Sequence, residues 1–126
     1  MDRLKIGPPV DFPVIQRKGV NMNNLLINLP YDNNKTFHVC ALLRYLIKVG
    51  RTYIIQGQQH VTLKSHTKPN SLDYWIRNNV ANNKDTAQAT NEVINQLANT
   101  GIFETDNHLE CPDSKNHCNG IKIKNV

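Results

Sequence analysis

The sequence lacks any apolar run of the roughly 18 residues that a membrane-crossing helix needs. Its first residues, Met1 to Pro9, contain neither the apolar stretch nor the small-residue cleavage site of a secretory signal. We therefore expect a cytoplasmic protein that makes no contact with membranes. A chain of 126 residues has the usual size of one domain, and a fold of this mass can bury a core without cross-links.

The motifs of the common enzyme classes are also absent. There is no glycine-rich phosphate loop, no GxGxxG, no GxSxG and no HExxH. Metal-dependent nucleases need clustered carboxylates with a lysine. Glu104, Asp106 and Glu110 are close in sequence, but none precedes a lysine by two positions. We therefore expect neither catalytic activity nor a cofactor.

Cysteine is scarce, with three residues at positions 40, 111 and 118. An odd count without a secretory signal favours reduced thiols. Cys40 lies among aliphatic neighbours and is expected to be a small core residue. Cys111 and Cys118 can face each other across a hairpin, either as thiols or as a disulfide, and we expect thiols.

A zinc site is the alternative for the same segment, because His108, Cys111, His117 and Cys118 lie within eleven residues. The spacing argues against it. Finger-type zinc sites use short-looped pairs such as CxxC, and this sequence has none. The side chains of the successive residues His117 and Cys118 also diverge in extended chain. We therefore expect no metal.

The charge balance is basic, with 15 Lys and Arg against 10 Asp and Glu and a formal net charge of +5. The cations are spread from Arg3 to Lys124 without a polybasic block. Such a spread is typical of an ordinary basic surface and equally of a folded surface that contacts phosphates. Charge alone therefore leaves nucleic-acid binding open.

The first part of the chain favours extended structure. Pro8, Pro9 and Pro13 exclude a regular helix there. We interpret residues 1–34 as an extended arm or a strap, and we favour a strap packed on the domain. Within it, Leu25–Leu29 is a short apolar run that can form a strand or a poor helix.

The spacing of apolar residues predicts a first helix over Lys35–Val49, capped by Asn34 or Thr36. Gly50 is suited to the left-handed position that ends a helix. The β-branched and aromatic residues at 52–56 and 60–64 flank a turn with glycine and predict a hairpin or a single strand.

Two further helices and a pair of strands are predicted after this region. The second helix begins at a cap on Asn70 or Ser71 and runs to Val80. The third spans Thr86–Asn99 and is ended by Gly101. Strands then surround a long polar loop at 112–120. The predicted core consists of apolar residues that share these periodicities: Phe37, Leu42, Leu46, Leu72, Trp75, Ile76, Val93, Leu97, Ile102, Phe103 and Ile121.

This succession of elements resembles a winged helix-turn-helix domain over about residues 35–125. The likeness is carried by Ser71 to Lys124, where two helices joined by a short turn precede a hairpin. Leu97-Ala98-Asn99-Thr100-Gly101-Ile102-Phe103 matches the family's step from the second helix of the pair into the first wing strand. Ile121-Lys122-Ile123-Lys124 matches the returning strand. The resemblance implies an α+β winged-helix domain at 35–126, preceded by the extended segment 1–34.

The resemblance also implies that the third helix enters the major groove of double-stranded DNA. The side of this helix opposite its apolar stripe carries amides and hydroxyls, and Asn and Gln can pair with adenine edges. The expected base-reading residues are Thr86, Gln88, Thr90, Asn91 and Asn95. The helix departs from the family in having Glu92 and neither Lys nor Arg. The phosphate contacts are therefore expected around it and at the wing tip: Lys64, Lys68, Arg77, Lys84, Lys115, Asn116 and His117.

Two functions of different class are compatible with this fold. The first is DNA binding, by a small regulator of transcription or by the recognition module of a larger protein, with a homodimer as a further arrangement. The second is a winged helix that contacts another protein and not DNA. A fold does not decide between them.

Overall fold

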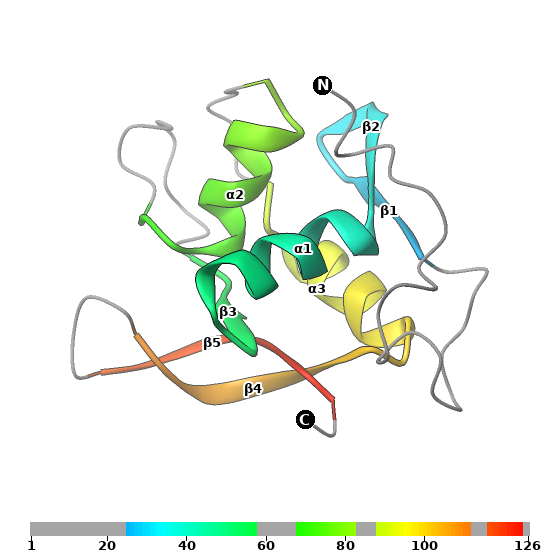
Figure 1. The fold of residues 1–126 in the computed structure, drawn as a ribbon. Coiled ribbons are helices and arrows are strands. Elements are labelled where there is room, and N and C mark those ends of the chain that lie inside the picture. Colours follow the sequence, from blue (N-terminus) through cyan, green and yellow to red (C-terminus); the bar gives the residue numbers. More distant parts are fainter. Residues whose placement is uncertain (1–24, 58–67, 83–87, 112–115, 125–126) are drawn as a thin grey trace.

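The computed structural model describes residues 25–57, 68–82, 88–111 and 116–124. Over these residues the chain forms three helices and two small antiparallel sheets (Figure 1). The predicted α+β class with three helices is therefore confirmed. Residues 1–24 of the predicted arm or strap at 1–34 lie outside the described residues, as do Lys64, Lys84, Thr86 and Lys115.

The first sheet is a hairpin of β1 (Leu26–Leu29) and β2 (Asp32–His38). Ile27 and Leu29 of β1 are buried, and Leu26 and Asn28 are exposed, as in a strand with one face on the core. Of the predicted segment 25–29, residues 26–29 thus form a strand and not a helix. The boundary drawn after residue 34 falls inside β2.

The first helix, α1 (Val39–Val49), begins four residues later than its apolar spacing predicts. The backbone of Thr36, Phe37 and His38 pairs with β1 instead, because an isolated strand would leave its polar groups without partners. His38 provides the cap in place of Asn34 or Thr36, and its Nδ1 accepts a hydrogen bond from the Cys40 N–H at 3.1 Å. The helix ends at Gly50 as predicted, with φ of 70°.

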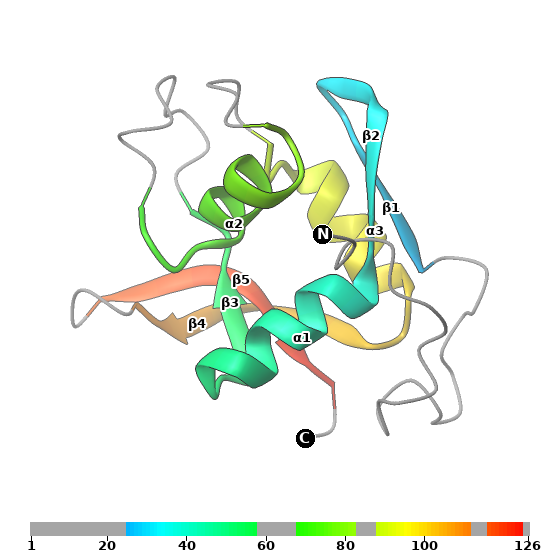
Figure 2. The ribbon, with the colours of Figure 1, turned by 45° about the horizontal axis from the view of Figure 1, so that its top comes forward.

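The second sheet contains β3 (Tyr53–Ile55), β4 (Phe103–Glu110) and β5 (His117–Ile123) in the order β3-β5-β4. All neighbours are antiparallel. β3 therefore pairs with the last strand of the chain, and residues 60–64 lie outside the described residues. The three helices lie on one face of this sheet (Figures 1 and 2).

The other two helices are α2 (Leu72–Asn79) and α3 (Asn91–Asn99). The Oγ of Ser71 caps α2 by accepting from the Tyr74 N–H at 3.1 Å. α3 begins later than the predicted start at Thr86, because Gln88 and Ala89 donate their N–H groups to Asp73 and stay outside the helix. The first helical bond runs from the Ile94 N–H to the Thr90 carbonyl.

One core joins the helices to both sheets, and every residue predicted for it is buried there. Phe37 of β2 meets Trp75 of α2 edge to face, with ring centroids 5.2 Å apart. β1 contributes Ile27 and Leu29 to the same cluster, and Leu25, which precedes β1, also belongs to it. None of the helices in the described ranges has the length and apolarity to cross a membrane.

Candidate nucleic-acid interface

The exposed side of α3 carries amide side chains. Val93, Ile94 and Leu97 are buried on its inner side. Asn91 and Asn95, which are one helical turn apart, are exposed, as are Glu92 and Asn99. The two asparagines therefore lie on the accessible side, where the apolar periodicity predicts them.

One flank of α3 is covered by β1. The Oε1 of Gln96 accepts from the Asn28 N–H at 2.8 Å, and its Nε2 donates to the Asn28 carbonyl at 2.9 Å. The side-chain amide thus pairs with the outer edge of β1 as the backbone of a neighbouring strand would. No sequence signal marks this pair, because a single glutamine on a polar helix face is ordinary.

Two of the predicted base-reading residues do not lie on the exposed helix face. Gln88 is fully buried, so its prediction as a residue on that face is wrong. The reason is that the segment before α3 is held inward against Asp73. Thr90 is half-buried at the N-cap of α3.

Arg77 is fully buried, so its prediction as a surface cation that contacts phosphate is wrong. Its Nε donates to the Asp73 Oδ1 at 3.0 Å, and these two residues are four positions apart on α2. A buried guanidinium requires such a partner, since an unpaired buried charge is very costly. Lys68, in the turn before α2, is half-exposed.

Asp73 is a residue that the sequence analysis missed. Besides Arg77, its Oδ1 accepts from the N–H groups of Gln88 at 3.1 Å and Ala89 at 3.3 Å. Its own N–H donates to the Gln56 carbonyl at 3.1 Å. A capping-type aspartate in the first turn of a helix gives no hint of these partners, because they are 15 and 16 residues away.

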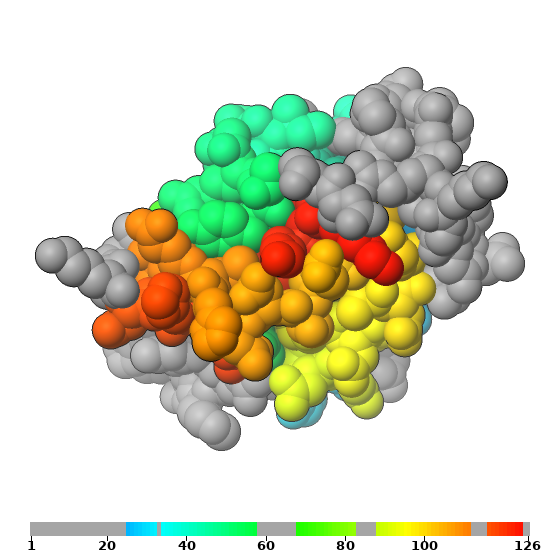
Figure 3. All heavy atoms as spheres, turned by 90° about the horizontal axis from the view of Figure 1, so that it is seen from below, coloured from blue at the N-terminus to red at the C-terminus, as the bar shows by residue number. Residues whose placement is uncertain are grey.

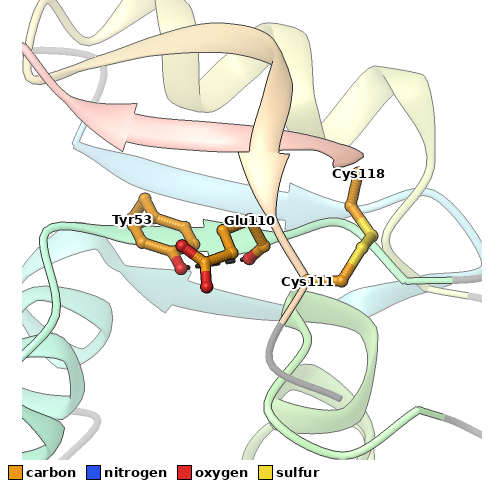
Figure 4. Close-up of a disulfide and its surroundings, with 4 residues drawn as sticks. All are labelled: Tyr53, Glu110, Cys111 and Cys118. Atoms are coloured by element: carbon orange, nitrogen blue, oxygen red, sulfur yellow. Dashed lines mark hydrogen bonds between the residues drawn. A yellow bond between two sulfur atoms is a disulfide. The ribbon is translucent and has the colours of Figure 1, made fainter. Parts of the chain in front are cut away.

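The end of the β4–β5 hairpin is closed by a disulfide between Cys111 and Cys118, whose Cα atoms are 5.7 Å apart (Figure 4). The prediction of free thiols here is wrong, while the prediction that the two residues face each other is confirmed. Pairing across the hairpin brings the two residues together, and the Cys111 N–H donates to the Asn116 carbonyl at 3.2 Å. The hydroxyl of Tyr53 donates to the Glu110 carbonyl at 3.0 Å just before the disulfide.

The two faces of this hairpin carry different side chains. Leu109 lies opposite Cys118, and Glu110 lies opposite His117. Directly opposed residues share a face and successive residues alternate. The rings of His108 and His117, with centroids 5.9 Å apart, are therefore on the face opposite the sulfur atoms. The same geometry places Cys111 and Cys118 on one face of the hairpin and His108 and His117 on the other, so the four side chains of the zinc alternative do not converge. In the ranges that the structure describes, no cluster fit to hold a metal ion occurs.

Ionic contacts on β4 and β5 are local. The Nζ of Lys122 lies 3.2 Å from the Asp106 Oδ2. The His108 N–H, and then Lys122, hold the pKa of Asp106 below its ordinary value of 3.8. Asn116 and His117 are exposed at the end of the hairpin, where the resemblance predicts phosphate contacts.

α3 and β4 lie side by side on one face of the molecule, in yellow and orange in Figure 3. This face combines α3, which has exposed amide side chains, with the β4–β5 hairpin, whose end is closed by the disulfide. Amides donate and accept at once, so this surface suits polar edges such as those of bases. Comparisons with protein-family models, with curated proteins and with solved structures found no match.

Proposed function

We propose that this chain is a winged helix-turn-helix domain that binds double-stranded DNA, as a small regulator or as the recognition module of a larger protein. The element order from α1 to β5 and the sheet order β3-β5-β4 support this, since both are compatible with a winged helix. In this interpretation α2 and α3 are the helix pair and the β4–β5 hairpin is the wing.

The observation that carries the proposal is the exposed amide pair of Asn91 and Asn95 on α3, beside the hairpin. A major groove admits one helix, and each bidentate amide–adenine pair is worth about 1–3 kcal/mol of discrimination. Asn91 and Asn95 are the proposed base-reading residues that the structure describes. The same base-reading role is proposed for Thr86, which lies outside the described residues.

The phosphate contacts are proposed for residues outside α3. Among described residues, Lys68 precedes the helix pair, and Asn116 and His117 end the hairpin. The same role is proposed for three lysines that lie outside the described residues: Lys64, Lys84 and Lys115. The net charge of +5 favours association with a polyanion.

A second candidate is a winged helix that binds a protein partner. The observation that favours it is the charge of α3, whose sequence contains Glu92 and neither Lys nor Arg. A polar helix surface with one carboxylate suits a protein partner as well as a base edge. The two candidates differ in their dependence on salt.

The test is fluorescence anisotropy with random-sequence duplex DNA at about 50 mM and about 200 mM salt. Release of counterions from about four phosphates would weaken binding at least about a hundredfold between these conditions. Binding that falls in this way supports DNA recognition. No binding at the lower salt concentration contradicts it and favours the protein-binding candidate.

A further inference from the structure

Asp73 joins the two helices of the proposed helix pair from inside the protein. It is 2% exposed, so it cannot itself contact a partner. Its Oδ1 receives three donors: the guanidinium of Arg77 on its own helix and the N–H groups of Gln88 and Ala89. The latter two immediately precede the N-cap of α3. One carboxylate oxygen therefore fixes where α3 starts relative to α2.

Gln56 connects the same point to the sheet. Its carbonyl accepts from the Asp73 N–H at 3.1 Å, and its Nε2 donates to the Ala89 carbonyl at 2.8 Å. Its own N–H donates to the Asn119 carbonyl of β5 at 2.8 Å. The start of α3 is thus tied through two buried residues to the strand that forms one arm of the hairpin.

Space around this network is tight. A Cβ on Gly57, which has φ of 99°, would lie 3.0 Å from the Asp73 Cβ and 2.9 Å from the Ser71 Oγ. A larger residue at position 57 would therefore press on Asp73 and Ser71.

We propose that Asp73 is a positioning residue for the α3 surface, which it holds at a fixed place relative to the β4–β5 hairpin. This inference rests on the proposed function, because its consequence is measured as DNA binding. Groups that read a base edge must be held within about half an ångström of their place. Without the Oδ1 acceptor, two buried N–H groups lose their partner and the start of α3 moves to find water or other acceptors.

The test compares two double variants that both lack the ion pair. Asp73→Asn with Arg77→Met keeps an acceptor for the N–H groups of Gln88 and Ala89. Asp73→Leu with Arg77→Met has a side chain of similar size and no acceptor. We expect the leucine variant to bind duplex DNA at least about tenfold more weakly than the asparagine variant. We expect the amide hydrogens of Gln88 and Ala89 to exchange faster in the leucine variant alone.

The outcomes separate the inference from the proposed function. Equal DNA affinity of two folded double variants overturns the role of Asp73 while the DNA-binding proposal stands. A wild-type protein that binds no DNA overturns both, whatever the exchange rates. A role in stability alone would lower the melting temperature of the leucine variant without changing its affinity below that temperature.

A second variant decides the question if the leucine variant does not fold. Asp73→Ala with Arg77→Met also removes the acceptor, with a smaller side chain than leucine at position 73. We expect it to bind duplex DNA at least about tenfold more weakly than the asparagine double variant, and to exchange the amide hydrogens of Gln88 and Ala89 faster. Equal DNA affinity of these two variants would overturn the inference.

Discussion

Individual residues determine where backbone segments can approach each other. Gly120 of β5 lies opposite Ile55 in the register of the sheet. A Cβ at this position would collide with the Ile54 carbonyl oxygen and lie 2.7 Å from the Ile55 Cα. Both obstacles are backbone, which cannot rotate away. The pairing of β3 with β5 therefore requires glycine here.

Gly120→Ala is expected to lower the free energy of unfolding by at least about 2 kcal/mol, because the added methyl group forces the two strands apart. Chemical denaturation measures this loss. Gly50→Ala is the matched comparison, since its Cβ would meet nothing within 4 Å and its cost arises from φ of 70° alone. That cost is about 1 kcal/mol. An equal loss in both variants would contradict the steric account.

The two exposed asparagines of α3 give a prediction about specificity. Replacing Asn91 and Asn95 together by alanine should reduce the preference for the best DNA sequence by about tenfold or more, while binding to random DNA changes little. Selection from a random duplex library, followed by affinity measurements, tests this. Asn78→Ala, an exposed asparagine on α2, is the control. Equal weakening on all sequences would mean that Asn91 and Asn95 do not read bases.

At the scale of elements, the helix starts depend on partners that are distant in sequence. α1 begins at Val39 because the preceding residues pair with β1, and α3 begins at Asn91 because the preceding residues bind Asp73. Apolar spacing predicts both helices and their ends but misplaces both starts. Helical periodicity is a local signal, and it cannot report a competing partner elsewhere in the chain.

The cap of α1 predicts a dependence on pH. Burial lowers the pKa of His38 below its ordinary value of 6.5, and the neutral ring accepts the Cys40 N–H. Between these two pKa values the unfolded chain binds more protons than the folded one, so stability is present above pH 6.5 and is lost as the pH falls. Denaturation midpoints from about pH 7.5 down to about pH 5 measure this. His38→Asn keeps a cap that does not titrate there and should flatten the slope, and an unchanged slope would exclude His38 as its source.

The disulfide at the end of the hairpin predicts a gain in stability. Closing the segment between residues 111 and 118 restricts the unfolded chain and is worth about 2.5 kcal/mol by loop-closure entropy. Reduction of the wild type, or Cys111→Ser with Cys118→Ser, should lower the free energy of unfolding by that amount. The double variant is also the control, because a reductant should not change it. A wild type that is equally stable with and without reductant would contradict this prediction.

At the scale of the whole molecule, the class and the core follow from the sequence. Burying apolar side chains dominates folding, and all predicted core residues lie in one cluster. The hairpin β1–β2 and the buried network at Asp73 do not follow, since each depends on polar contacts between distant segments. Two of the predicted site residues, Arg77 and Gln88, are buried for that reason. A polar residue is expected on the surface. Its burial can be recognised only when the groups that hydrogen-bond to it are known.

The surface of the molecule offers a rival location for a polyanion. α1 contains Arg44 and Lys48 and has no acidic residue, and both are exposed. The proposed surface, in contrast, is made by α3 and the end of the hairpin. Net charge is a property of the whole protein and cannot choose between these two places.

The most direct test of the α3 and hairpin surface is NMR, with the amide signals followed while duplex DNA is added. We predict that the largest changes occur at Asn91, Asn95, Asn116 and His117, and that Arg44 and Lys48 change little. Changes centred on α1, with α3 and the hairpin unaffected, would contradict the proposed surface.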